Sequence, residues 1–200
     1  TDQLTTQAQQ EKTRPANDLE PARIRLERII IAPKLSKFDC DMLRLGLDAA
    51  DLLKRYEAEH APVERILASH YAQREALDTL RRVFSPRQFL NRDQLNSAAL
   101  SESDLVISFG RDIHFLCVSH HVDGGFILGV NSDPVRSEGA LVRYSSEQLM
   151  QLLDALARGE FLVEEWTRLE GSVNGIPLPK IMSECFLGER DRLEMSRYVL

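Results

Sequence analysis

Long apolar runs are missing from this sequence. No stretch approaches the roughly 20 consecutive apolar residues that a membrane-spanning helix needs, and the opening TDQLTTQAQQEKTRP has no apolar core of the kind found in signal peptides. A basic, amphipathic surface of the kind that binds membranes is missing as well. We therefore expect no membrane partner, and we expect a cytoplasmic protein.

Cysteine is scarce, and positive charge is not in excess. Cys40, Cys117 and Cys185 are odd in number and far apart, which predicts neither a disulfide framework nor a CxxC metal clip. We expect all three to be reduced, small apolar side chains. Because 25 Lys and Arg stand against 31 Asp and Glu, for a net charge of −6, the chain has no bulk attraction for phosphate backbones. We expect no nucleic-acid partner.

The remaining composition is that of an ordinary globular protein with three unlike parts. Two hundred residues, 43% of them hydrophobic and 28% charged, are enough for one full domain or one domain with part of another. Residues 1–22 are polar, rich in Gln and Thr and broken by prolines, which predicts a flexible arm. Residues 23–159 predict an α/β domain, and residues 160–200 predict the beginning of a β-rich second domain that is truncated.

Strand signals recur three times in the α/β part. A β-branched run over 28–33 ends in proline, and apolar runs over 104–110 and 125–131 each lead into a polar segment. The second run ends at Gly110, and Asp112 follows two positions later. Since ligands usually bind where parallel strands deliver polar loops to the carboxyl edge of a sheet, we expect the site at this edge.

Apolar residues at helical spacing predict helices between these strands. One stripe over 42–56, with Ser36 or Asp39 as candidate N-cap, predicts a single helix. Further stripes predict helices over 63–80 and 146–158. The alternation of strands and helices is typical of an α/β sheet.

The pattern departs from βα units in two places. Residues 82–103 contain only weak signals, and no strand is predicted there with assurance. In the β-rich tail, Asn174-Gly175 between apolar residues predicts a hairpin, and residues 182–187 and 193–200 are two further candidate strands.

Three stretches, taken in order, carry a resemblance to a known family. LVISFGRDIHFL (105–116) stands where that family has a strand, GGDGT and a helix, and GVNSDPVRSEG (129–139) matches a G-[IV]-N strand end followed by a DPxRSEG loop. WTRL (166–169) and SECFLGE (183–189) match a third element. The sequence thus resembles the NAD kinases, in the branch of the mitochondrial enzyme. Lipid kinases share GGDGT, but the DPxRSEG loop is not expected of them.

The resemblance implies an N-terminal Rossmann-like nucleotide-binding domain and the start of a C-terminal all-β sandwich domain. It implies transfer of a phosphoryl group from ATP, or polyphosphate, to the 2′-hydroxyl of the adenosine ribose of NAD, to give NADP. ATP, NAD and a divalent metal, Mg²⁺, are the implied cofactors, with no metal-ligating residue assigned, and a homo-oligomer is implied if the second domain is completed. Asp112 matches the catalytic aspartate, whereas the residues alone allow a helix N-cap.

The resemblance also assigns binding residues. Those that match positions around the nucleotide are Gly110, Arg111, Ile113, Asn131, Ser132, Gly139, Ala140, Leu141, Ser183 and Glu184.

Some of these positions depart from the family pattern. Arg111 and Ile113 replace glycines, and β-branched Ile113 is expected to resist a turn with positive φ. His114 replaces threonine and is either a proton carrier or a packed side chain. Ser183 replaces an asparagine, and Arg136 either serves the site or pairs with Glu138. These departures keep a second hypothesis open, namely a catalytically degenerate relative that binds a nucleotide or a partner protein.

Overall fold

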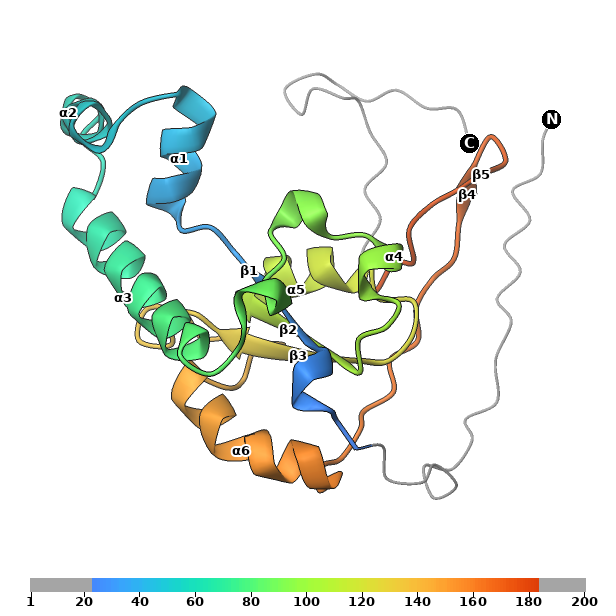
Figure 1. The fold of residues 1–200 in the computed structure, drawn as a ribbon. Helices are drawn as coiled ribbons and strands as arrows, with labels where there is room; N and C mark the ends of the chain where they lie inside the picture. The colour runs from blue at the N-terminus through green and yellow to red at the C-terminus, as the bar shows by residue number, and fades with distance from the viewer. Residues whose placement is uncertain (1–22, 184–200) are drawn as a thin grey trace.

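A parallel three-stranded sheet forms the centre of the computed structural model, which describes residues 23–183 (Figure 1). Its strands are β1 (Ile29–Pro33), β2 (Leu105–Gly110) and β3 (Phe126–Asn131), in the order β1-β2-β3. All six residues of β2 are buried, as expected for the central strand of a parallel sheet covered on both faces. The predicted α/β class is confirmed at this level, and the arrangement is compatible with a Rossmann-like domain.

Six α-helices accompany the sheet within residues 23–183. They are α1 (Lys37–Leu45), α2 (Ala49–Ala58), α3 (Val63–Arg81), α4 (Ser97–Leu100), α5 (Asp112–Ser119) and α6 (Ser146–Arg158). Short 3₁₀ turns are η2 (Leu26–Arg28), η3 (Pro86–Gln88) and η4 (Arg92–Gln94). None of the helices in this part of the chain is long and apolar enough to cross a membrane.

The prediction of one helix over 42–56 is wrong, because the chain breaks at Gly46. Gly46 adopts φ 63° and ends α1 as a left-handed C-cap, its N–H bonding to the Met42 carbonyl. Asp48 then caps α2 by accepting a hydrogen bond from the Asp51 N–H. At the start of α1 the cap is Ser36 and not Asp39: the Ser36 hydroxyl accepts from the Asp39 N–H at 3.1 Å.

Alternate residues of β2 divide the core between the two faces of the sheet. Leu105, Ile107 and Phe109 pack with residues of α3 and α6, and Val106 packs with residues of α5 and of the 90–100 segment. The 82–103 region contributes an isolated parallel bridge, Phe89 to Ile31, instead of a strand. A separate cluster holds α1, α2 and α3 together, and we call these three helices the helical unit.

The predicted Asn-Gly hairpin is confirmed beyond α6. β4 (Ser172–Val173) and β5 (Ile176–Pro177) pair antiparallel, and Asn174 and Gly175 both adopt positive φ, at 51° and 79°. The arm 1–22, Glu184, the 193–200 strand and most of the 182–187 strand lie outside the described residues. The truncated β-sandwich domain and the boundary at residue 160 stay predictions.

Candidate functional site

The carboxyl ends of the three strands meet along one edge of the sheet. The Lys34 N–H after β1 donates to the Phe109 carbonyl at 2.8 Å, and the Ser132 N–H after β3 donates to the Gly110 carbonyl at 3.1 Å. The polar segments that follow the strands are thereby placed side by side. We call these strand ends, with residues 111–112 and 132–141, the sheet edge.

Asp112 joins two of the segments at this edge. Its Oδ2 accepts a hydrogen bond from the Ala140 N–H and its Oδ1 accepts one from the Leu141 N–H, both at 3.0 Å. The N-cap position of α5 belongs to Arg111, so the alternative of Asp112 as N-cap does not apply. The structure thus brings the predicted Asp112, Ala140 and Leu141 into direct contact.

The expected strain at Ile113 is not found. Arg111 is extended, at φ −128° and ψ 175°, and Ile113 lies within α5. In the described part of the chain the non-glycine residues with positive φ are His60 and Asn174. The turn into α5 therefore needs no glycine at either position, and the Ile113 side chain, 77% exposed, points into solvent instead of narrowing the turn.

Gly110 is required at this edge by packing. A Cβ atom at this position would lie 2.8 Å from Cδ2 of His114 and 3.0 Å from Cβ of Lys34. His114 itself is buried and donates from Nε2 to the Ala32 carbonyl at 2.8 Å. Burial lowers the pKa of the imidazole, which keeps it neutral. Of the two alternatives for His114, the structure shows the packed side chain, tying α5 to β1.

Asn131 organises the loop that follows β3. Its buried side chain donates from Nδ2 to the Ser137 carbonyl at 2.7 Å and accepts at Oδ1 from the Asp133 N–H at 3.0 Å. Ser132 next to it is also buried, and its hydroxyl has no hydrogen-bond partner among the described residues. In this structure Asn131 acts on the loop and not on an exposed surface.

Sequence reasoning missed Asp133, which the structure shows to be a central residue of the loop. Its buried carboxylate accepts from the Ser69 hydroxyl at 2.6 Å and from Nη1 of Arg136 at 3.1 Å. Arg136 is therefore paired with Asp133 and not with Glu138. The SDPVRSEG stretch contained the signal for Asp133, but nothing in the sequence singled out Ser69 on α3.

The glycines of this region let two backbone segments approach closely. A Cβ on Gly129 would lie 2.2 Å from the Leu141 carbonyl oxygen, and one on Gly139 would lie 2.3 Å from Cγ2 of Val142. No side chain fits at these distances. Gly139 is thus needed at this position for a reason of packing, and its predicted role at the nucleotide stays a prediction.

Ser183 is exposed and follows the bridge between Leu169 and Ile181, and no hydrogen bond described for residues 23–183 joins it to the other predicted site residues.

Two cations accompany Asp112 at the sheet edge. Burial, and after it the nearby charge of Arg111, lowers the pKa of Lys34. Nη2 of Arg111 lies 3.9 Å from Oδ2 of the buried Asp133. No group of three or more His, Cys, Asp or Glu side chains in the described residues is placed to hold a metal ion. The edge thus combines the Asp112 carboxylate and the buried, paired Asp133 with cationic side chains.

Comparisons with known proteins agree with the motifs. No family model matches the sequence. "Probable NADH kinase" of Oryza sativa subsp. japonica is 33% identical in an alignment of 99 residues that covers 42% of this chain and 30% of that protein. "NAD kinase 2, mitochondrial" of Xenopus tropicalis is 33% identical in an alignment of 127 residues that covers 60% of this chain and 27% of that protein. The chain spans less than a third of the length of either relative. Over the part that these matches cover, it is a relative of the NAD kinases.

Proposed function

We propose that this chain carries part of an NAD kinase. The reaction is transfer of a phosphoryl group from ATP, or polyphosphate, to the 2′-hydroxyl of the adenosine ribose of NAD, to give NADP. The observation that supports it is the Asp112 carboxylate, held at the sheet edge by the N–H groups of Ala140 and Leu141, each at 3.0 Å. Sequence relationship to proteins named as NAD and NADH kinases points to the same chemistry.

Asp112 is suited to the role of general base. The attacking hydroxyl must lose its proton as it bonds to phosphorus, and an ionised carboxylate within hydrogen-bond reach accepts it. Such a carboxylate has about four lone-pair positions, of which the two amides occupy two. The amides fix its orientation while leaving positions for the hydroxyl, and phosphoryl transfer depends chiefly on such positioning.

Cationic groups at the edge have the second role, which is to hold phosphate oxygens. Lys34 lies close enough to Arg111 for the charge of that arginine to add to the effect of burial in lowering the pKa of Lys34. Mg²⁺ in phosphoryl-transfer sites is held by one or two carboxylates together with substrate phosphates. The described residues gather no cluster of His, Cys, Asp or Glu for such an ion, so a bound ion would be held chiefly by the substrate phosphates and would supply their charge neutralisation.

A degenerate, non-catalytic relative is the second candidate function. The observation that favours it is again at Asp112: both carboxylate oxygens already bind the 140–141 backbone, which is also what a purely structural residue would do. Arg111 and Ile113 in place of glycines agree with it. Such a protein would bind a nucleotide or a partner without turnover.

NADP formation from NAD, ATP and Mg²⁺, measured by an enzymatic cycling assay, separates the two. We expect the chain to turn over and Asp112→Asn to lower the rate by about 100-fold or more, since a general base contributes on that order. Asp123→Asn, at an exposed acid away from the sheet edge, is the matched control and should keep the rate. Unchanged NADP formation in Asp112→Asn would refute the assigned mechanism, and no turnover in any variant, with nucleotide binding retained, would favour the degenerate relative.

A further inference from the structure

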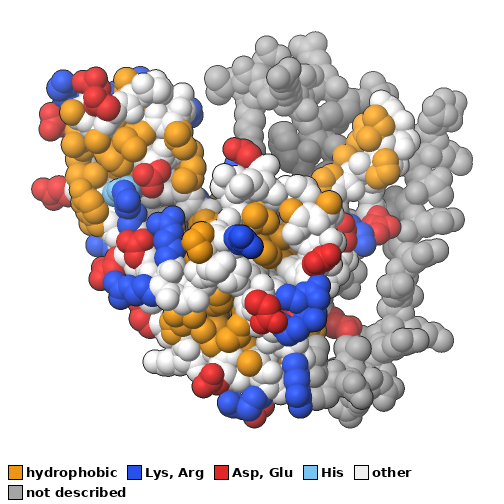
Figure 2. Space-filling model, in the orientation of Figure 1, with side chains coloured by type: hydrophobic (Ala, Val, Ile, Leu, Met, Phe, Trp, Pro, Cys, Tyr) orange, Lys and Arg blue, Asp and Glu red, His pale blue; other side chains and the backbone are white. Residues whose placement is uncertain are grey.

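The loop that holds Asp112 contains a buried carboxylate, that of Asp133, which is 1% exposed. Figure 2 shows Lys and Arg side chains gathered on the surface where α3 approaches the sheet. Two arginines lie near Asp133: Nη1 of Arg136 donates to its Oδ1 at 3.1 Å, and Nη2 of Arg111 lies 3.9 Å from its Oδ2. Burial of a carboxylate is costly unless its partners are correctly placed. The position of Asp133 therefore depends on the groups that surround it.

One of these groups comes from outside the loop, from α3. The Ser69 hydroxyl donates to Oδ2 of Asp133 at 2.6 Å. One turn later on the same helix, Nε2 of Gln73 donates to the Ser69 hydroxyl oxygen at 3.0 Å. A serine hydroxyl has a single proton, and Gln73 occupies one lone pair of its oxygen, so the proton is directed at Asp133. Ser69 is thus oriented by its own helix toward the loop.

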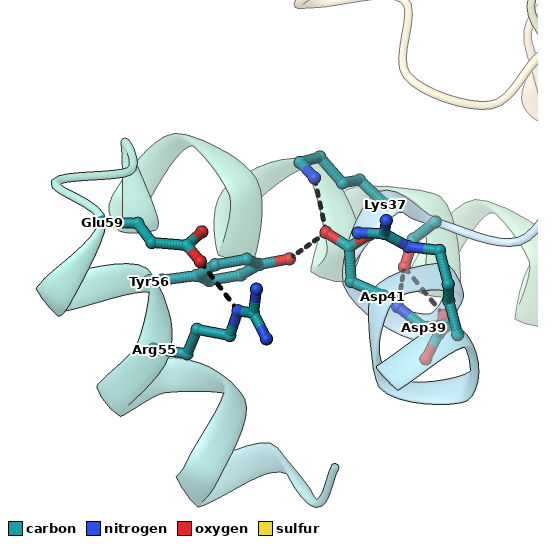
Figure 3. A network of polar contacts seen from close by, with 8 residues as sticks. Lys37, Asp39, Asp41, Arg55, Tyr56 and Glu59 are labelled. Atoms are coloured by element: carbon teal, nitrogen blue, oxygen red, sulfur yellow. Dashed lines mark hydrogen bonds and ion pairs between the residues drawn. The ribbon is translucent and has the colours of Figure 1, made fainter. Parts of the chain in front are cut away.

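The other two helices of the helical unit hold α3 in place. Nδ1 of His70, the residue after Ser69, lies 2.8 Å from the hydroxyl of Ser36, which caps α1. Asp41 of α1 in turn accepts a hydrogen bond from the Tyr56 hydroxyl of α2 at 2.7 Å (Figure 3). A buried apolar cluster with side chains from all three helices packs between them. Ser69 therefore presents its hydroxyl from a rigid framework.

From Asp133 the loop continues to the two amides that hold Asp112. The Asp133 N–H donates to Oδ1 of Asn131 at 3.0 Å, and Nδ2 of the same side chain donates to the Ser137 carbonyl at 2.7 Å. Residues 140–141 follow shortly after, and their N–H groups each bind Asp112 at 3.0 Å. A displacement of Asp133 would therefore shift the donors that orient Asp112.

We propose that Ser69 is a positioning residue for the Asp112 carboxylate. It acts through Asp133, which fixes the loop whose N–H groups hold that carboxylate. The reaction that Asp112 would assist rests on the proposed function. The coupling between Ser69 and residues 140–141 does not, and it is measured without turnover.

Hydrogen–deuterium exchange of the full chain, followed by mass spectrometry, tests the coupling. Ser69→Ala removes the hydroxyl and Ser69→Thr keeps one. Thr79→Val is the matched control, because the Thr79 hydroxyl donates within α3, to the Glu75 carbonyl at 3.2 Å. We expect the amides of residues 140–141 to exchange about tenfold faster in Ser69→Ala, the effect of weakening hydrogen bonds to a charged group. In Ser69→Thr and Thr79→Val, exchange should stay within about twofold of the parent.

The NADP assay then tests whether the coupling serves the reaction. We expect Ser69→Ala to lower kcat about tenfold and to leave the KM for NAD and for ATP within about twofold, because a misplaced base slows the chemical step without removing a substrate contact. Ser69→Thr should restore kcat. A merely structural role of Ser69 would lower the unfolding free energy and leave the kcat of the folded chain unchanged.

Each outcome has a distinct meaning. Faster exchange and a lower kcat in Ser69→Ala, both restored in Ser69→Thr, support the proposal. Equal exchange at residues 140–141 in Ser69→Ala and Thr79→Val would overturn it, and so would faster exchange with an unchanged kcat. If exchange rises in Ser69→Ala and the parent forms no NADP, the proposed function fails and the coupling stands. If the parent forms NADP and Ser69→Ala changes neither exchange nor kcat, the proposal fails and the function stands.

Discussion

The sheet edge and the helical unit hold their polar groups in two different ways. At the sheet edge, backbone N–H groups of 140–141 hold Asp112, and the loop lies so close to β3 that Gly129 leaves no room for a Cβ. In the helical unit, side chains hold Asp41: Lys37 and Arg44 from neighbouring turns of α1 and Tyr56 from α2. A carboxylate held by backbone N–H groups depends on the path of the main chain. A carboxylate held by side chains can be altered by replacing one of those side chains.

Gly129→Ala is expected to have the largest effect on stability. Its Cβ would lie 2.2 Å from the Leu141 carbonyl oxygen, a backbone atom, so the loop must move and the bonds to Asp112 must loosen. Overpacking of this kind costs about 2 kcal/mol of unfolding free energy. Urea denaturation followed by circular dichroism measures the change.

Gly124→Ala is the control for this substitution, since a Cβ there meets nothing within 4 Å. It should change the unfolding free energy by less than about 0.5 kcal/mol. Equal effects of the two substitutions would show that the loop is not held by close backbone packing, and the contrast between the two regions would fail.

Asp41→Asn tests the side-chain network and should cost less, about 1.5 kcal/mol, the effect of losing hydrogen bonds to a charged group. The pKa of Asp41 is about 2 in the folded chain against an ordinary 3.8, so the carboxylate binds protons less readily when folded. Its contribution to stability is therefore complete above about pH 4 and is lost as the pH falls toward 2. Denaturation at pH 7 and at pH 3 measures both effects.

Between pH 7 and pH 3 the Asp41→Asn variant should lose less unfolding free energy than the parent chain, because it lacks the carboxylate whose protonation causes part of that loss. Asp51→Asn is the matched control on α2: its ion pair with Lys54 is exposed, and such pairs contribute at most about 0.5 kcal/mol on a helix. If the two variants lose the same stability between pH 7 and pH 3, the network around Asp41 is not coupled to folding.

Ile113→Ala should have the smallest effect. The side chain is 77% exposed and the backbone is helical, so removing the β-branched side chain relieves no strain. We expect a change below about 0.5 kcal/mol in the unfolding free energy. A stabilisation well above that value, measured by thermal unfolding, would show that Ile113 does strain the turn into α5.

Structural elements that depend on residues close together in the chain follow from the sequence, with one exception. The three strands, the Asn174-Gly175 hairpin and the α6 helix capped by Ser145 and ended by Gly159 follow from hydrophobic period and turn chemistry. Each requires only residues a few positions apart. The single helix over 42–56 was wrong because its apolar stripe continues through a residue, Gly46, that adopts the left-handed C-cap conformation.

Contacts between segments far apart in the chain could not be predicted from the sequence. Asp112 finds its partners 28 and 29 residues away, and Asp133 finds Ser69 64 residues away on α3. The pairing of Arg136 with Asp133 instead of Glu138 depends on how the loop turns back on itself. No local pattern encodes these partners, since each depends on where the folded chain returns to the sheet.

By itself the sequence determined the α/β order, the strand ends that carry Gly110, Asp112 and Asn131, and the relationship to the NAD kinases. It did so because period, turn residues and motifs are local properties of the chain. The tertiary structure alone decided that the Asp112 carboxylate meets the backbone of residues 140–141 and that Ser69 of α3 meets the buried Asp133. The physical reason is that hydrogen-bond partners and local charge are set by distances across the fold, which hydrophobic packing establishes.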